Sequence, residues 1–142
     1  MATPVKQLKG VTDTMLGILG EKSIKDNVDL VEAAATPAAR KALAADCGCE
    51  PSELLELVNR ADLARINGVS GVYSDLLEEA GVDTVKELAM RRPDNLHAKL
   101  IETNDAAQLT QRPPTAAQVE DWVEQAKALP RIVTRSEEHT SE

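Results

Sequence analysis

Apolar residues recur along this chain at intervals of three and four positions, the spacing of one buried face of an α-helix. The clearest stripe comprises Val119, Trp122, Val123, Ala126 and Leu129. Capping and breaking residues divide the pattern into about eight segments with short connections. The pattern therefore predicts the all-α class, as a compact bundle of about eight short helices.

Several helix ends can be assigned from the residues that usually occupy them. Serine, threonine and aspartate side chains accept hydrogen bonds from the first helical N–H groups, and proline fits the first helical position. Two of the expected starts, at Thr84 and Thr115, also have an acid or amide three residues later, as in a capping box. Gly81 is expected to end a helix in the left-handed conformation, and residues 104–114 are expected to form a polar loop. The full set of expected starts is Ser23, Thr36-Pro37, Glu50-Pro51, Thr84, Asp94 and Thr115.

One segment of the chain occurs twice, 58 residues apart. Residues 63–81 contain an apolar helix end, a glycine-rich turn and a second amphipathic segment. A weaker copy begins near residue 8, in which Gly10 matches Gly68 and Val11 matches Val69. The arrangement resembles a helix-hairpin-helix, so we predict two such units.

The length of 142 residues suits one domain built from two helical halves. We expect a single domain over residues 1–134. Its first hairpin unit is expected at about 3–35, its second at about 53–92 and its C-terminal helix at about 115–129. Residues 135–142 read like a translated sequencing-library adapter, so we expect this tail to be an artefact that lies outside the fold.

Acidic residues outnumber basic ones by 24 to 16, which gives a net charge of −8. Without the tail the balance is 21 to 15, or −6. This charge favours solubility and repels nucleic acid at long range. The sequence has no run of 18 apolar residues and no apolar N-terminal leader, so we expect a cytoplasmic protein that does not span a membrane.

The second hairpin is the part of the sequence with a recognisable binding chemistry. The first turn of a helix presents N–H groups without intrahelical partners, which can bind a phosphate oxygen, and glycines let the phosphate approach closely. The candidate phosphate-binding residues are Gly68, Val69, Ser70 and Gly71. The candidate supporting basic residues are Arg60, Arg65 and Lys86.

Each hairpin could instead be a tight connection between packed helices. In the first hairpin, Thr12 or Asp13 would satisfy the N–H groups with its own side chain, and Asp13 would repel a phosphate. In the second, acidic residues at Asp75, Glu78 and Glu79 lower the local positive potential. We favour the structural interpretation for the first hairpin, and both interpretations stay open for the second.

No set of residues in the sequence suits catalysis, a cofactor or a metal. Cys47 and Cys49 flank Gly48, but no second cysteine pair and no histidine stand at metal-ligand spacing. His97 falls within a predicted helix without a partnering nucleophile. We therefore predict reduced thiols at a helix-ending turn, no cofactor, no metal and no enzymatic activity.

Five motifs follow one another along the chain: Asn59-Arg-Ala-Asp-Leu63, the Gly68 hairpin, Ala80-Gly-Val-Asp-Thr-Val85, Asn95-Leu-His-Ala98 and Val119-Glu-Asp-Trp122. In this order they resemble a bacterial family called domain of unknown function 4332, and the resemblance covers nearly all of residues 3–134. It implies a helix-hairpin-helix-like all-α fold and no established activity. Family members commonly have a basic residue within the second hairpin, where this chain has Ser70, Gly71 and Val72.

Together these features predict a non-catalytic helical binding module. The first candidate partner is nucleic acid, bound weakly and without sequence preference through phosphates at the second hairpin. The alternative is a protein-protein interaction or assembly module that does not bind nucleic acid. The hairpin favours the first candidate, the net charge favours the alternative, and the oligomeric state is left open.

Overall fold

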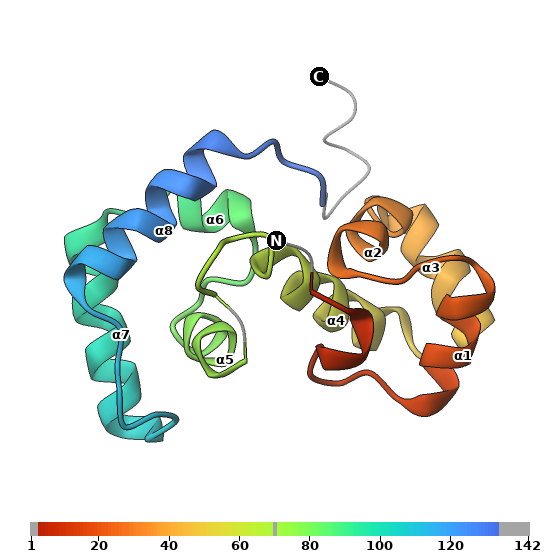
Figure 1. Cartoon of the computed structure of the whole chain (residues 1–142), viewed down its shortest axis with the longest axis horizontal. Coiled ribbons are helices and arrows are strands. Elements are labelled where there is room, and N and C mark those ends of the chain that lie inside the picture. The colour runs from red at the N-terminus through yellow and green to blue at the C-terminus, as the bar shows by residue number, and fades with distance from the viewer. Residues whose placement is uncertain (1–2, 70, 134–142) are drawn as a thin grey trace. The chain divides into compact units, whose positions relative to one another are not determined.

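The computed structural model describes residues 3–69 and 71–133, and within these ranges it contains eight α-helices and one short 3₁₀-helix (Figure 1). The predicted all-α class is confirmed, since the described residues form no strand. The described chain divides into two units. The N-terminal unit comprises residues 3–65 and 131–133, and the C-terminal unit comprises Ile66–Pro130. The single domain over residues 1–134 stays a prediction, and the tail from residue 135 lies outside the described residues.

The N-terminal unit is organised around one central helix. Its elements are η1 (Val5–Gln7, a 3₁₀-helix), α1 (Asp13–Glu21), α2 (Asn27–Ala33), α3 (Pro37–Cys47) and α4 (Pro51–Leu63). Helices α2 and α3 both pack on α4, and α1 packs on α3. The core of this unit is aliphatic, and α4 contributes Leu54, Leu57, Val58 and Ala61 to it.

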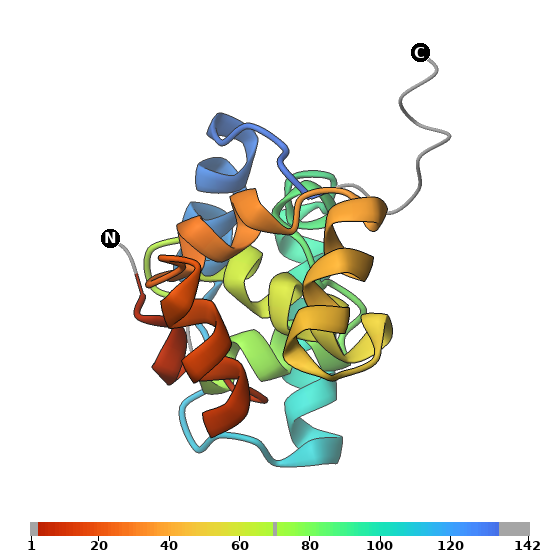
Figure 2. The same ribbon diagram turned by 90° about the vertical axis from the view of Figure 1, so that its right-hand side faces the viewer.

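The C-terminal unit has the same pattern of packed helices. Its elements are α5 (Val72–Glu79), α6 (Val85–Ala89), α7 (Pro93–Ala107) and α8 (Ala116–Ala128). Helices α6 and α7 both pack on α8, and α5 packs on α7. The loop after α7 turns back at the end of that helix before α8 begins (Figures 1 and 2). Each of these packed helix pairs in one unit therefore has a counterpart in the other unit.

Backbone geometry repeats at the same offset of 58 residues that the sequence indicates. Gly10 and Gly68 both have positive φ angles, of 97° and 96°. The N–H of Ile24 donates to the carbonyl of Leu19 at 2.9 Å, and the N–H of Val82 donates to the carbonyl of Leu77 at 2.8 Å. The two copies thus share their turn and helix-end conformations, while the label helix-hairpin-helix stays a prediction.

The offset changes to 65 residues at the last helix of each unit. Helices α4 and α8 are both 13 residues long and both begin with a capping box. The buried stripe Leu54, Leu57, Val58 and Ala61 of α4 corresponds to Val119, Trp122, Val123 and Ala126 of α8. The seven additional residues enter through a longer α7 and a longer loop after it, since α3 has 11 residues and α7 has 15. The chain is therefore a tandem repeat of a four-helix unit.

Most predicted helix ends are confirmed, and two are wrong. Thr36, Thr84 and Thr115 each accept the expected N-terminal hydrogen bond, and Gly81 is left-handed with φ 93°. Ser23 does not begin a helix. It takes the left-handed conformation with φ 63° at the end of α1. The cap of α2 is Asp26, whose side chain accepts from the N–H of Asp29 at 2.8 Å.

The second wrong start is Asp94, because α7 begins at Pro93 and its N-cap is Arg92, two residues before Asp94. Proline sets the helical φ angle at the first position, so no side-chain cap is required there. The Asp94 carboxylate instead accepts a hydrogen bond from the N–H of Asn95. The predicted loop 104–114 is also too long, since α7 continues to Ala107 and leaves a connection that begins at Gln108.

Candidate functional site

The turn of the second hairpin is in contact with α8. Gly68 lies so close to Trp122 that a Cβ atom at this glycine would stand 3.1 Å from the indole Nε1. The indole also packs against Tyr73, with ring centroids 5.4 Å apart. Trp122 is only 2 % exposed, as expected for the largest apolar side chain in the protein. Val69, which follows Gly68 in the sequence, is also buried. Two of the four candidate phosphate-binding residues are thus part of the packed interior or in contact with it.

A second contact with α8 is made by the backbone of the same turn. Gln125 accepts a hydrogen bond from the N–H of Asn67 at 2.8 Å and donates one to the carbonyl of Asn67 at 3.1 Å. The Gln125 amide also donates to the Asp121 carboxylate on the same helix. A side-chain amide is a specific partner for the backbone of one residue here, because it meets the N–H and the C=O of Asn67 together. The turn before α5 therefore serves as a docking point for α8.

The remaining open position of the hairpin is Gly71. It precedes α5 without a side-chain cap, and a Cβ atom there would meet nothing within 4 Å. Its φ and ψ angles of 51° and −120° suit glycine, since L side chains rarely adopt this conformation. Ser70, the other candidate in this turn, lies outside the described residues.

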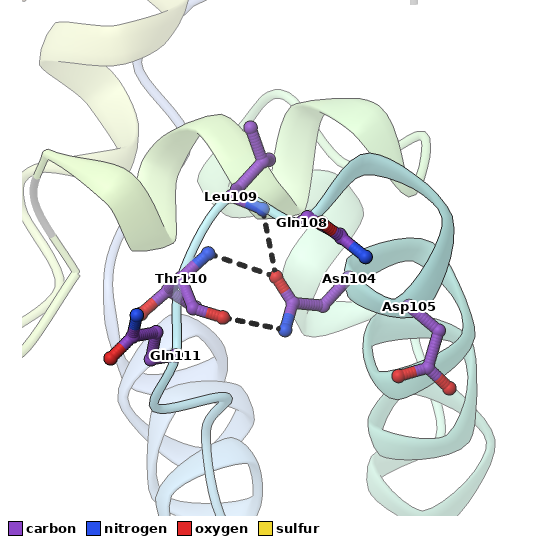
Figure 3. A pocket seen from close by; sticks show the side chains of 6 residues that line it. All are labelled: Asn104, Asp105, Gln108, Leu109, Thr110 and Gln111. Atoms are coloured by element: carbon purple, nitrogen blue, oxygen red, sulfur yellow. Dashed lines mark hydrogen bonds between the residues drawn. The ribbon is translucent and has the colours of Figure 1, made fainter.

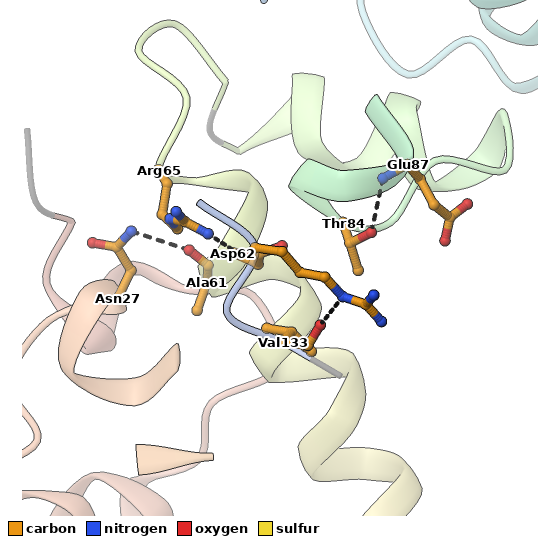
Figure 4. A network of polar contacts seen from close by, with 8 residues as sticks. Asn27, Ala61, Asp62, Arg65, Thr84, Glu87 and Val133 are labelled. Atoms are coloured by element: carbon orange, nitrogen blue, oxygen red, sulfur yellow. Dashed lines mark hydrogen bonds and ion pairs between the residues drawn. The ribbon is translucent and has the colours of Figure 1, made fainter. Parts of the chain in front are cut away.

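The three candidate basic residues have different surroundings. Arg65 forms an ion pair with Asp62 at 2.8 Å, and both side chains are nearly inaccessible, at 6 % and 3 % exposure (Figure 4). Arg60 lines a pocket beside the first hairpin. Lys86 is exposed on α6. Arg65 is thus neutralised locally, and no shared cationic cluster of these three is observed within either described unit.

Figure 4 also shows the buried Asn27 side chain, which is bonded to α4. The Asn27 amide donates to the carbonyl of Ala61 at 3.0 Å and accepts from the N–H of Thr3 at 2.7 Å. These bonds tie the chain start and α2 to α4. Buried polar side chains with such partners are structural elements and are not free to bind a ligand.

Charge is unevenly distributed between the two units. The C-terminal unit has six basic and eleven acidic side chains, a net charge of −5. The described part of the N-terminal unit has nine basic and ten acidic side chains, a net charge of −1. The glycine-rich turn therefore belongs to the unit with the more negative potential, which opposes the approach of a phosphate backbone.

The first hairpin has a cap and an adjoining pocket. Thr12 accepts a hydrogen bond from the N–H of Met15 at 3.1 Å, so Thr12 is the N-cap, one of the two expected alternatives. A pocket of about 300 Å³ opens between this turn and α4. Its lining residues are Lys9, Gly10, Thr12, Met15, Glu53, Glu56, Leu57 and Arg60.

The two cysteines belong to a helix-ending turn, as predicted. Gly48 is left-handed with φ 71°, its N–H donates to Ala45, and the N–H of Cys49 donates to Ala44. This is the bonding pattern of a Schellman motif, whose last residue commonly packs back onto the helix. Both thiols are free, and burial is the main cause that raises the pKa of each one. The reactive thiolate form is therefore disfavoured at neutral pH.

A second pocket, of about 520 Å³, lies at the end of α7 (Figure 3). Its centre is Asn104, which accepts from the N–H groups of Leu109 and Thr110 and donates to the carbonyl of Thr110. The asparagine thus reproduces the bonds of a turn. His97 supports the same loop further along, since its Nε2 donates to the carbonyl of Pro114 at 3.1 Å. Both side chains therefore hold the connection to α8.

The sequence predicts that Trp122 is buried against the second hairpin unit, and its burial and its contact with Gly68 confirm this. The pairing of Gln125 with Asn67 was not predicted. One signal could have found it. Aligning α8 with α4 requires a shift from 58 to 65 residues, and this shift places Trp122 at the position of Leu57.

The described residues contain no group of three or more histidine, cysteine, aspartate or glutamate side chains that could hold a metal ion. None of the helices in the described ranges has the length and apolar character needed to cross a bilayer. No curated protein and no solved structure matches the chain. The family model described as domain of unknown function (DUF4332) matches residues 9–129, so the chain belongs to this family.

Proposed function

We propose that this protein is a non-catalytic module that binds another protein, with the second hairpin acting as an internal brace. The observation that carries the proposal is the occupation of the hairpin turn by α8. The Gln125 side chain is bonded to the backbone N–H and to the backbone carbonyl of Asn67. The Trp122 indole contacts Gly68. Asn67 and Gly68 are exposed, but an N–H group that already donates to Gln125 is not available to a phosphate oxygen.

The electrostatics support the same choice of partner. The unit that contains the turn has a net charge of −5, and the nearby Arg65 is paired with Asp62. Binding to a nucleic-acid backbone depends on cations that neutralise phosphates, whereas protein interfaces tolerate mixed charge.

A second candidate is weak binding to nucleic-acid phosphates at the start of α5. The specific observation in its favour is Gly71, which leaves that helix start without a side-chain cap and with open space beside it. Asp75 in the first turn of α5 opposes an anion there.

Titration of a labelled duplex at low salt, followed by fluorescence anisotropy, separates the two candidates. Protein binding predicts no saturable signal at tens of micromolar protein. A signal that is lost in Val72→Asp and kept in Thr12→Ala would establish the second candidate, because an acid at the first position of α5 repels phosphate there. Val72 is preferred to Gly71 for this test because the angles of Gly71 exclude most side chains.

Affinity capture from an extract gives the positive test. The partner proteins retained by the full chain should be the same before and after complete nuclease digestion. Loss of all partners on digestion would contradict the proposal.

A further inference from the structure

The pocket of the N-terminal unit occupies the same place in the repeat as the Trp122 indole of the C-terminal unit. Gly10 corresponds to Gly68 in the turn, and Leu57 corresponds to Trp122 on the last helix. Both Gly10 and Leu57 line the pocket. A Cβ atom at Gly10 would meet nothing within 4 Å, whereas at Gly68 it would meet the indole.

The other residues around the indole also have counterparts in the pocket. Tyr73, which packs on Trp122, corresponds to Met15. Asn67 and Gln125, which are hydrogen-bonded to each other, correspond to Lys9 and Arg60. All of these N-terminal counterparts line the pocket, so the site is the one that the tryptophan fills in the other unit.

We propose, building on the protein-binding function above, that this pocket receives an aromatic side chain, most suitably tryptophan, from a partner protein. In the C-terminal unit, Trp122 completes the packing at this position. In the N-terminal unit, a residue of the partner protein would do so. The occupant must come from another protein, since Trp122 is the one tryptophan of the sequence and is buried.

The size and chemistry of the pocket fit this occupant. Its volume is about 300 Å³, and a cavity of about 150 Å³ accepts a benzene ring. Leu57 and Met15 supply an apolar floor and a thioether, which makes favourable contacts with aromatic rings. Arg60 and Lys9 place positive charge beside the site, and cations are attracted to the face of an indole.

The pocket is also suited to a peptide that carries the ring. Glu53 and Glu56 line the pocket together with the two basic residues, so the charges of its lining sum to zero. Such a lining can bond both the N–H and the carbonyl groups of a peptide. A phosphate would meet two carboxylates there.

The test is a titration of the ¹⁵N-labelled full chain with N-acetyl-tryptophanamide, followed by NMR. Saturable shifts are expected at the amides of Gly10, Met15 and Leu57, while N-acetyl-alaninamide should leave them unchanged. Leu57→Trp should fill the pocket from within and weaken binding at least tenfold. Ser52→Trp is the matched control, because it adds an indole at an exposed position on the same helix outside the pocket.

Three outcomes would overturn the proposal. They are an absence of shifts in the wild-type chain, shifts confined to residues outside the pocket, and equal binding by folded Leu57→Trp. Much tighter binding of free indole than of the capped amino acid would also overturn it, since the ligand would then be a free aromatic compound. The wild-type shift map decides the matter even if Leu57→Trp does not fold. A failure here would leave the nuclease-resistant partners unaffected, so it is distinguishable from failure of the proposed function.

Discussion

The two units of this protein have the same helices in the same packing order, yet they close their first turn in different ways. In the C-terminal unit the last helix places Trp122 on Gly68 and pairs Gln125 with the turn. In the N-terminal unit Leu57 is too small to reach Gly10, and a pocket takes the place of the ring. The difference indicates that one copy uses this position for its own stability while the other leaves it available.

The largest expected effect comes from removing the ring. Trp122→Ala should lower the free energy of unfolding by about 3–5 kcal/mol, because it deletes a buried aromatic side chain and leaves a cavity. Denaturant unfolding followed by circular dichroism measures the change. Trp122→Leu, which installs the residue of the N-terminal unit, should cost less. An unchanged midpoint for Trp122→Ala would show that the indole does not hold the turn to α8.

A pair of glycine substitutions isolates the contribution of the contact between Gly68 and Trp122. Gly10 and Gly68 have nearly the same φ angle, so alanine suffers the same backbone strain at both, about 1–2 kcal/mol. At Gly68 the new methyl group also meets the indole at 3.1 Å, which should add about 1–3 kcal/mol. Melting curves of the two variants give the difference directly. Equal losses would mean that Trp122 moves aside without cost.

The smallest expected effect is a gain in stability. Ser23 and Gly81 end the corresponding helices α1 and α5, and both are left-handed. Serine is strained in this conformation, so Ser23→Gly should raise the free energy of unfolding by about 1 kcal/mol. The reverse change, Gly81→Ser, should lower it by a similar amount. A loss of stability in Ser23→Gly would show that the serine side chain makes a compensating contact.

The helix starts were predictable where a local side chain determines them. Thr36 and Thr115 cap their helices through atoms three residues away, so the information is contained in the segment itself. Ser23 was assigned as an N-cap because serine often has that role. It is instead part of the end of α1, where the N–H of Ile24 donates to the carbonyl of Leu19. Asp94 was misassigned because Pro93 begins the helix without needing a cap.

The candidate site was less predictable than the fold, because it depends on contacts between distant positions. The glycine-rich turn is visible in the sequence, but the residues of α8 that contact it, Trp122 and Gln125, lie more than 50 residues away. The residues that decide whether the turn is open, Trp122 and Gln125, differ from their counterparts Leu57 and Arg60 in size and charge. Local patterns locate a turn, whereas the opposite helix determines what the turn can bind.

The bond between Gln125 and Asn67 also makes one amide a reporter of local motion. Asn67 is exposed, so its N–H would ordinarily exchange with deuterium from solvent within a short time. Because that N–H donates to the Gln125 side chain, its exchange requires this bond to open. The exchange rate of this single amide therefore measures how often the bond between Gln125 and the turn opens, without global unfolding.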